Sequence, residues 1–116
     1  PFFTPGSYQV ASIDDRDFVD DKKSFWNDVY GIKMTNMIPK VMREGFVDEM
    51  SKDVINSVVQ KIADIDLHTV KTEELNFASE FDLKITKYDS INGFIVWFDT
   101  DFTMGHEVVS LKTSKT

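Results

Sequence analysis

The chain has 116 residues and a mass of 13.4 kDa, which is enough for one domain and too short for two ordinary ones. It contains no cysteine, which excludes disulfides, thiolate zinc sites and thiol nucleophiles. The formal net charge is −7 and no basic stripe is visible, which argues against nucleic-acid binding. An acidic surface either merely keeps the domain soluble, which is the simpler interpretation, or suits a basic partner. No apolar run approaches the roughly 20 residues of a membrane span, so we expect a soluble, globular chain.

The first predicted element is a short strand over residues 8–13, followed by a mostly charged stretch, residues 14–28. Within and after that stretch, aromatic and aliphatic residues recur at the spacing of one side of a helix; they are Phe25, Trp26, Val29 and Tyr30. Gly31 then favours a helix end. We therefore predict a helix that carries this apolar stripe and stops at Gly31.

Residues 34–50 form a different kind of segment, which holds four of the five methionines. Pro39 and Gly45 interrupt it, and Pro39 rules out a long helix there. Methionine suits adaptable contact surfaces. A segment of this kind either folds back on the core or docks on a partner, and the residues alone leave both alternatives open.

The next stretch, residues 52–70, has an ambiguous pattern, because its apolar residues fit helical spacing at first and alternate from Ile62 onward. We predict a helical turn over residues 52–56 and a strand that ends near Val70.

From Leu75 the chain alternates between apolar and polar residues, which predicts an antiparallel strand over residues 75–86. Turn-forming residues follow, and then a run rich in aromatic and β-branched residues, 93–98, which predicts a strand covered on both faces. Together the two predict a β-hairpin. The fold class is accordingly mainly β, with antiparallel strands.

Few residues suggest chemistry. The carboxylate pairs Asp14-Asp15, Asp20-Asp21 and Glu73-Glu74 are adjacent, whereas a catalytic pair must converge across a cleft, so we expect a solvated surface. Asp99 and Asp101 follow a predicted strand end and suit either a hard cation or a polar rim. His68 and His106 lack neighbouring ligands, so we predict no metal site and no catalytic residue. The five glycines are never clustered, which predicts no phosphate or dinucleotide loop.

Several motifs resemble the protein arginine N-methyltransferase family. Residues 25–34, Phe-Trp-Asn-Asp-Val-Tyr-Gly-Ile-Lys-Met, are similar to that family's aromatic-Trp-x-x-Val-Tyr-Gly-hydrophobic-x-Met stretch. Residues 11–15 resemble its strand and acidic pair, residues 66–77 its Asp-hydrophobic-x-Thr-Val stretch, and residues 92–102 the strand that follows. These motifs occur in the family's order over most of the chain.

The resemblance implies part of a C-terminal β-barrel or sandwich with an inserted short helical dimerisation arm. Residues 1–116 would form one partial domain, with the arm at residues 24–50. In the family this arm docks on the cofactor domain of a second subunit, so we expect a homodimer. The residues expected at the contact are Trp26, Val29, Tyr30, Ile32, Met34, Met37 and Ile38.

The parent protein would transfer methyl groups from S-adenosylmethionine to arginine guanidinium nitrogens of basic proteins, inside the cell, in the cytoplasm or nucleus. The family's glycine-rich cofactor motif, two-glutamate loop and Thr-His-Trp loop have no match here. We therefore expect no catalytic and no cofactor-binding residue in this chain, and no activity from it alone. The alternative is a stand-alone β-sandwich module for protein interaction. No charged-then-apolar leader is present, so we expect no secretory signal.

Overall fold

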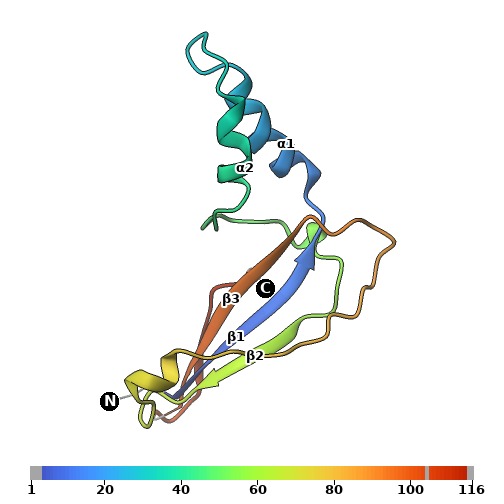
Figure 1. Ribbon diagram of the computed structural model, residues 1–116. Coiled ribbons are helices and arrows are strands. Elements are labelled where there is room, and N and C mark those ends of the chain that lie inside the picture. Colours follow the sequence, from blue (N-terminus) through green and yellow to red (C-terminus); the bar gives the residue numbers. More distant parts are fainter. Residues whose placement is uncertain (1–3, 104, 115–116) are drawn as a thin grey trace.

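The computed structural model describes residues 4–103 and 105–114, which form one antiparallel sheet and a projecting helical arm. The sheet has four strands in the order β2-β1-β3-β4 (Figure 1). Their bounds are β1 Thr4–Ile13, β2 Gln60–Ile65, β3 Gly93–Phe102 and β4 Val109–Lys112. The mainly β fold class with antiparallel strands is confirmed, and the sheet is open rather than closed into a barrel.

The centre of the sheet is the long ladder between β1 and β3. Val10 pairs with Val96 and Tyr8 with Phe98, so branched and aromatic side chains meet across the strands, as they do in stable sheets. The ladder ends where Ile13 pairs with Gly93. A Cβ atom on Gly93 would lie 3.4 Å from the Ile13 side chain, which is ordinary van der Waals contact, so Ile13 packs directly against this end of β3. The strands predicted at residues 8–13 and 93–98 are confirmed, and both are longer than predicted.

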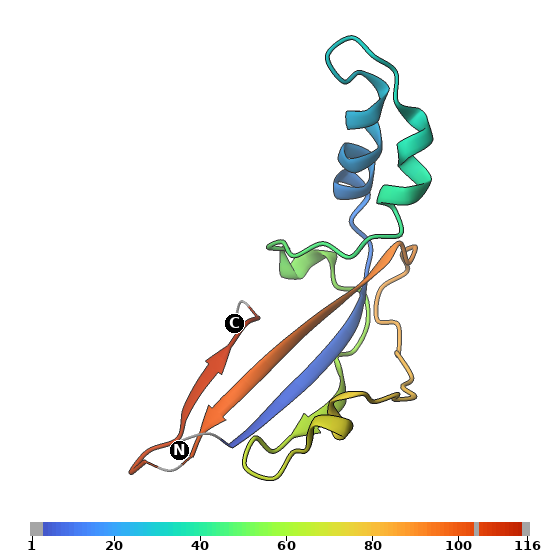
Figure 2. The ribbon, with the colours of Figure 1, turned by 60° about the vertical axis from the view of Figure 1, so that its left-hand side comes forward.

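The arm consists of two short antiparallel legs beyond one end of the sheet (Figure 2). The outgoing leg is α1, Arg16–Ser24, extended by a 3-10 turn at Phe25–Asn27. The returning leg is a 3-10 turn at Thr35–Met37 and α2, Ile38–Val41. The Cα radius of gyration is 18.1 Å, whereas a compact chain of this length has about 13 Å. The arm therefore makes the molecule elongated.

Sequence explains the limits of both helices. The Asp15 side chain accepts a hydrogen bond from the Phe18 N–H and so caps the start of α1. Lys22 and Lys23 lie in its last turn, where positive charge offsets the helix dipole. Pro39 sits in the first turn of α2, the only part of a helix that tolerates proline, and the helix stays short as expected. None of the helices in the described ranges is long and apolar enough to cross a bilayer.

The root of the arm is fixed by a buried polar junction. Asn56 is completely buried, its Oδ1 accepts a hydrogen bond from Ser12 Oγ at 2.6 Å, and its Nδ2 donates to the Ser90 carbonyl at 2.8 Å. Ser57 Oγ accepts the Ser12 N–H at 2.9 Å. Three segments distant in sequence are thus tied together beside the buried hydrophobic side chains of Val10, Ala11 and Ile13.

We expect Asn56→Ala to lower the free energy of unfolding by about 2 kcal/mol, because it leaves buried partners at Ser12 and Ser90 without their hydrogen bonds. Urea denaturation measures this loss. Asn36→Ala is the matched control, since Asn36 is exposed, and should change stability by less than about 0.5 kcal/mol. Equal midpoints for the two variants would contradict the role given to the junction.

The predicted helix through Tyr30 is wrong. Regular helix ends at Ser24, the 3-10 turn ends at Asn27, and Val29 and Tyr30 lie in a tight turn. Tyr30 has φ of 52° and Gly31 of 82°, values that no right-handed helix contains. The Asp28 carboxylate accepts the Gly31 N–H at 2.6 Å and stabilises the turn in place of a further helical turn.

The predicted strand over residues 75–86 is also wrong, and so is its hairpin with residues 93–98. β3 pairs with β1 and β4. Residues 72–75 form a 3-10 turn, and the described part of the stretch after it contributes a single bridge, between Ile85 and Ser57. Alternation satisfied the side-chain requirement for a strand, but a strand also needs a neighbour that takes up its backbone hydrogen bonds.

Four smaller predictions have clear outcomes. The helical turn is confirmed at Lys52–Val54. The strand expected to end near Val70 ends at Ile65, because the Asp66 carbonyl accepts the Val70 N–H and closes a turn. β3 is not covered on both faces, since Phe94 is 63% exposed. Asp99 and Asp101 lie within β3 rather than after it. β4 had no counterpart among the predicted elements.

Candidate functional site: the exposed tip of the arm

The tip of the arm is a tight turn between the two legs. The Val29 N–H donates to the Ile32 carbonyl at 2.8 Å, and the Ile32 N–H donates to the Val29 carbonyl at 3.0 Å. The two central residues, Tyr30 and Gly31, both have positive φ. This is the type I′ geometry, which reverses the chain within two residues.

Tyr30 is an unusual residue for that position. A bulky side chain in the left-handed region carries backbone strain, and Asn, Asp or Gly is the usual occupant. In this conformation the Tyr30 side chain is fully exposed at the far end of the arm. Residues kept in strained, exposed positions cluster at sites of recognition, so Tyr30 is a candidate contact residue.

The structure brings all seven predicted contact residues into this tip, but in two roles. Tyr30, Ile32 and Met34 are exposed, with Ile32 at 63%. The other four are partly covered and support the turn; they are Trp26, Val29, Met37 and Ile38. For example, the Trp26 carbonyl accepts the Met34 N–H at 2.9 Å.

Three further apolar residues of the arm are exposed and were not among the predicted contacts: Phe25, Phe46 and Val47. The Phe25 ring meets Trp26 edge-on, 5.1 Å between centroids. Phe46, which follows the returning leg, meets Phe18 of α1 edge-on at 5.8 Å, and the Lys22 ammonium lies 4.7 Å from the Phe46 centroid. The sequence signal for Phe46 and Val47 was two adjacent apolar residues after Gly45 in a segment without periodicity.

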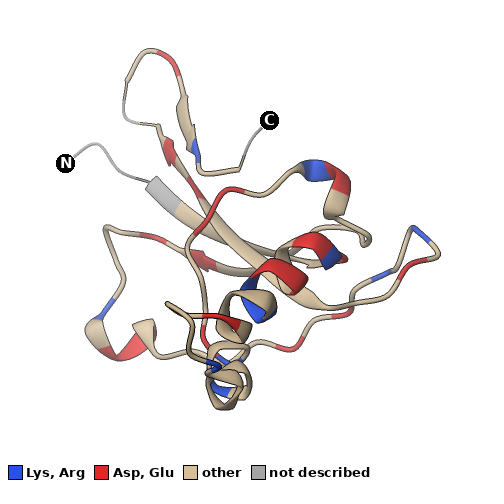
Figure 3. Ribbon diagram, turned by 90° about the horizontal axis from the view of Figure 1, so that it is seen from above, with Lys and Arg blue, Asp and Glu red and all other residues tan. Residues whose placement is uncertain are grey.

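Figure 3 shows acidic positions along the arm and around its root. At the arm root, Asp14 Oδ1 accepts a hydrogen bond from the Asn92 amide at 2.8 Å, and Asp15 caps α1. A shallow groove of about 390 Å³ beside them is lined by Asp14, Asp15, Arg16, Asp17, Val54 and Asp89. The carboxylate pair Asp14-Asp15 therefore helps to anchor the arm.

The described residues do not fit a metal ion or the cofactor that the resemblance implies. Within the described ranges, no three His, Asp or Glu side chains converge as metal ligands. Asp101 accepts a hydrogen bond from Ser110, while His68 and His106 are exposed in separate turns. S-adenosylmethionine needs an apolar slot for its adenine ring, but the two grooves described for this part of the chain are lined mainly by polar side chains.

The chain exposes far more surface than a self-contained protein of its mass. Its accessible surface is 9,109 Å², whereas a folded monomer of 13.4 kDa exposes about 6,500 Å². Besides the tip, the excess includes one face of β3, where Phe94, Val96 and Phe98 are 44–63% exposed. Apolar surface of this extent is typical of regions that a partner, a ligand or another part of a longer chain covers.

Comparison with known proteins agrees with this picture of an interaction unit. The sequence model of one family, described as "Arginine methyltransferase oligomerization subdomain", matches residues 6–116. Protein arginine N-methyltransferase 1 of Schizosaccharomyces pombe is 36% identical over 105 residues. Protein arginine N-methyltransferase 8-B of Danio rerio is 36% identical over 107 residues. Each alignment covers 90% of this chain, but only 31% and 25% of the respective relatives.

Solved structures show the same arrangement. The Trypanosoma brucei PRMT1 enzyme–prozyme heterotetrameric complex with AdoHcy superposes with a TM-score of 0.81 at 30% identity, covering 96% of this chain and 35% of that one. Arabidopsis thaliana protein arginine methyltransferase 10 superposes with a TM-score of 0.72 at 14% identity, covering 99% of this chain and 41% of that one, which supports the fold alone. The chain thus spans about a third of the length of the proteins it matches.

Proposed function

Because this chain belongs to the arginine methyltransferase family, whose oligomerization subdomain it carries, we propose that it is part of a protein arginine N-methyltransferase and joins two of its subunits. The observation that supports this role is the arm tip. A fully exposed tyrosine and a largely exposed isoleucine stand at the end of a two-legged projection, where they cannot serve the chain's own core.

The proposed arrangement is a homodimer in which each arm docks on the cofactor domain of the other subunit. Exposed aromatic and aliphatic residues at the end of a rigid projection suit insertion into an apolar pocket. The polar junction at Asn56 and Ser12 would fix the direction of the arm, because it ties the arm root to the end of the sheet. The contact would then hold the two catalytic domains in a set orientation.

The proposed reaction belongs to the whole protein. A guanidinium nitrogen of the substrate attacks the sulfonium methyl group of S-adenosylmethionine; the new N–C bond forms as the C–S bond breaks, and the nitrogen loses a proton. S-adenosylhomocysteine leaves. This chain would contribute scaffold and an acidic surface: its net charge of −7 favours approach of basic, arginine-containing proteins. We place the parent protein inside the cell, in the cytoplasm or nucleus, on the strength of the family resemblance.

Binding and activity experiments test whether cofactor binding and methyl transfer belong to the longer protein and not to this chain alone. The isolated chain should show no heat of S-adenosylmethionine binding in titration calorimetry and should add no methyl group to an Arg-Gly-rich peptide. A longer protein that carries this sequence after a cofactor domain should methylate the same peptide, read as 14 Da increments by mass spectrometry. Saturable cofactor binding by the isolated chain, or an inactive longer protein, would overturn the proposal.

A further inference from the structure

Asn92 clamps the point where β1 leads into the arm. Its Oδ1 accepts the Asp15 N–H at 3.0 Å, and its Nδ2 donates to Asp14 Oδ1 at 2.8 Å. Its own backbone N–H donates to the Ile13 carbonyl at 3.0 Å. Both polar atoms of the side-chain amide are therefore used, one as an acceptor and one as a donor, and together they hold the two residues that precede α1.

The Asp14 carboxylate accepts this bond in a poorly solvated position. Its side chain is only 10% exposed, and its other oxygen lies 3.4 Å from the Arg16 guanidinium. The backbone at this residue is fixed as well, because the Asp14 N–H donates to the Val54 carbonyl at 2.9 Å. A side chain placed against Asp14 Oδ1 must therefore donate a hydrogen bond, since a second acceptor would face a largely buried negative charge.

Asn92 is followed by glycine, and the other four asparagines of the chain are not. An asparagine amide can be attacked by the backbone nitrogen of the next residue, and glycine hinders that attack least because it has no Cβ atom. Asn92 is exposed, so water reaches it. Gly93 forms the last pair of the β1–β3 ladder, with Ile13, and the ends of a ladder open more readily than its centre. The Asn92 amide thus combines a reactive neighbour with access to water.

We propose that Asn92 is a site of spontaneous deamidation, and that the reaction releases the root of the arm. The Gly93 nitrogen attacks Asn92 Cγ; the new N–C bond closes a succinimide ring, and the side-chain nitrogen leaves as ammonia with the proton of the Gly93 N–H. Water then opens the ring at either carbonyl, which yields aspartate or isoaspartate at position 92 without oxidation or reduction. The Asp15 N–H favours the first step, because it donates to the oxygen that gains negative charge.

Neither product can replace the clamp. A carboxylate at position 92 still accepts the Asp15 N–H, but it has no hydrogen to donate to Asp14. Two carboxylates would then meet at hydrogen-bond distance, one of them largely buried, and like charges this close repel each other. Isoaspartate also inserts a methylene group into the main chain just before β3. Deamidation therefore loosens the arm root as the protein ages, and the loss of ammonia makes the change irreversible.

Peptide mapping by mass spectrometry tests the site. After incubation at neutral pH and body temperature, we expect Asn92 to convert at least tenfold faster than Asn56, which is completely buried, or Asn76, which is exposed. Gly93→Ala should slow the conversion at least tenfold. Alanine fits there, because Gly93 does not have positive φ and its added Cβ would make only ordinary contact with Ile13. Equal rates at Asn92 and Asn76, or no slowing by Gly93→Ala, would overturn the proposed site.

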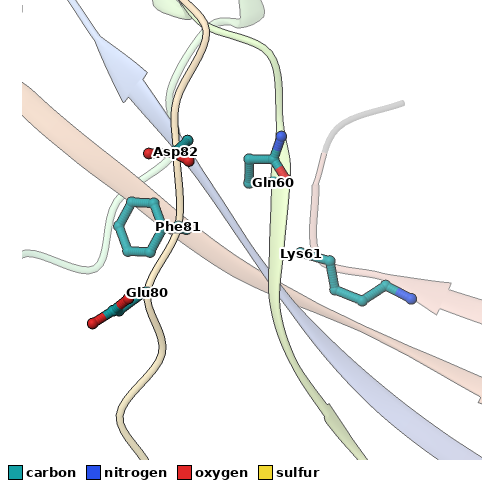
Figure 4. A pocket seen from close by; sticks show the side chains of 5 residues that line it. All are labelled: Gln60, Lys61, Glu80, Phe81 and Asp82. Atoms are coloured by element: carbon teal, nitrogen blue, oxygen red, sulfur yellow. The ribbon is translucent and has the colours of Figure 1, made fainter.

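Hydrogen exchange tests the consequence. Asn92→Asp reproduces one product, and Gln60→Glu is the matched control because it makes the same amide-to-carboxylate change on β2. Figure 4 shows Gln60 in a groove that Glu80 and Asp82 also line, so this control likewise adds a carboxylate near acidic residues. We expect the Asp14 amide to exchange at least tenfold faster in Asn92→Asp than in the control, while amides at the centre of the sheet keep their rates. Equal exchange at Asp14 would show that the root stays closed and that deamidation does not release it.

Discussion

Replacing Tyr30 by glycine and Ile32 by alanine in a longer protein that carries this chain is expected to weaken dimerisation at least 100-fold. The two side chains are the largely exposed apolar groups of the turn at the arm tip. An aromatic anchor at the centre of an interface commonly contributes about 2 kcal/mol, and a lesser apolar contact such as Ile32 about 1 kcal/mol. Their combined loss of about 3 kcal/mol corresponds to a change of about 100-fold in the dissociation constant.

Glycine is chosen at position 30 so that loss of the side-chain contact can be distinguished from damage to the fold of the arm. Tyr30 has φ of 52°, a conformation that glycine adopts without strain, so Tyr30→Gly leaves the arm intact or slightly more stable. Sedimentation velocity gives the dissociation constant, and circular dichroism verifies the fold. Lys33→Ala is the matched control, because Lys33 is exposed near the same turn but is not apolar. If the double variant dimerised as tightly as this control, the arm tip would not be part of the interface.

Loss of the dimer is expected to abolish most methyl transfer by the same longer protein, because activity in the proposed arrangement depends on two subunits held together. The rate should recover when the protein concentration is raised above the new dissociation constant. Activity that stays normal in a variant shown to be monomeric would separate catalysis from oligomerisation.

The isolated chain is expected to self-associate at micromolar concentration. β4 is an edge strand that pairs only with β3, and Val109 and Leu111 on it are more than half exposed. Beside it, the exposed face of β3 carries Phe94 and Val96. An open edge next to uncovered apolar surface is a template for pairing with another copy.

Lysines on the edge should suppress this association, because charged side chains blunt edge strands. With Val109→Lys and Leu111→Lys together, we expect the concentration at which the chain associates in sedimentation experiments to rise at least tenfold. Tyr88→Lys is the control, since Tyr88 is fully exposed in a loop outside the strands. A sharp monomer boundary for the unaltered chain, independent of concentration, would contradict the prediction.

The sequence carried several elements that depend on local information. The strands at residues 8–13 and 93–98 were recognisable from β-branched and aromatic residues, and both lie in the sheet. Pro39 predicted that this segment contains no long helix, and α2 accordingly has only four residues. The apolar residues at the tip were predicted as a group. Which of them are exposed and which support the turn was not predicted, because the turn geometry decides which side chains point outward.

The wrong predictions share a cause: side-chain spacing was interpreted correctly, but backbone conformation and pairing decided the structure. Helical spacing through Tyr30 was real, but the helix ends earlier, and the chain turns where the Asp28 carboxylate accepts the Gly31 N–H and two residues have positive φ. Alternation over residues 75–86 was real as well, but within it only residues 84–86 pair with another segment, residues 56–58, which lie before β2. β4 is short and joins the sheet only through β3, so its four residues gave little periodic signal.

By itself, then, the order of amino acids determined which segments prefer to be extended, where proline and glycine interrupt them, and which family's motifs the chain carries. Strand partners, the direction of the arm and the exposure of Tyr30 were decided only in three dimensions. Backbone pairing and burial join residues far apart in the chain, such as Ser12 with Asn56 or Tyr8 with Phe98, and no local pattern of side chains encodes which distant segment will complete them.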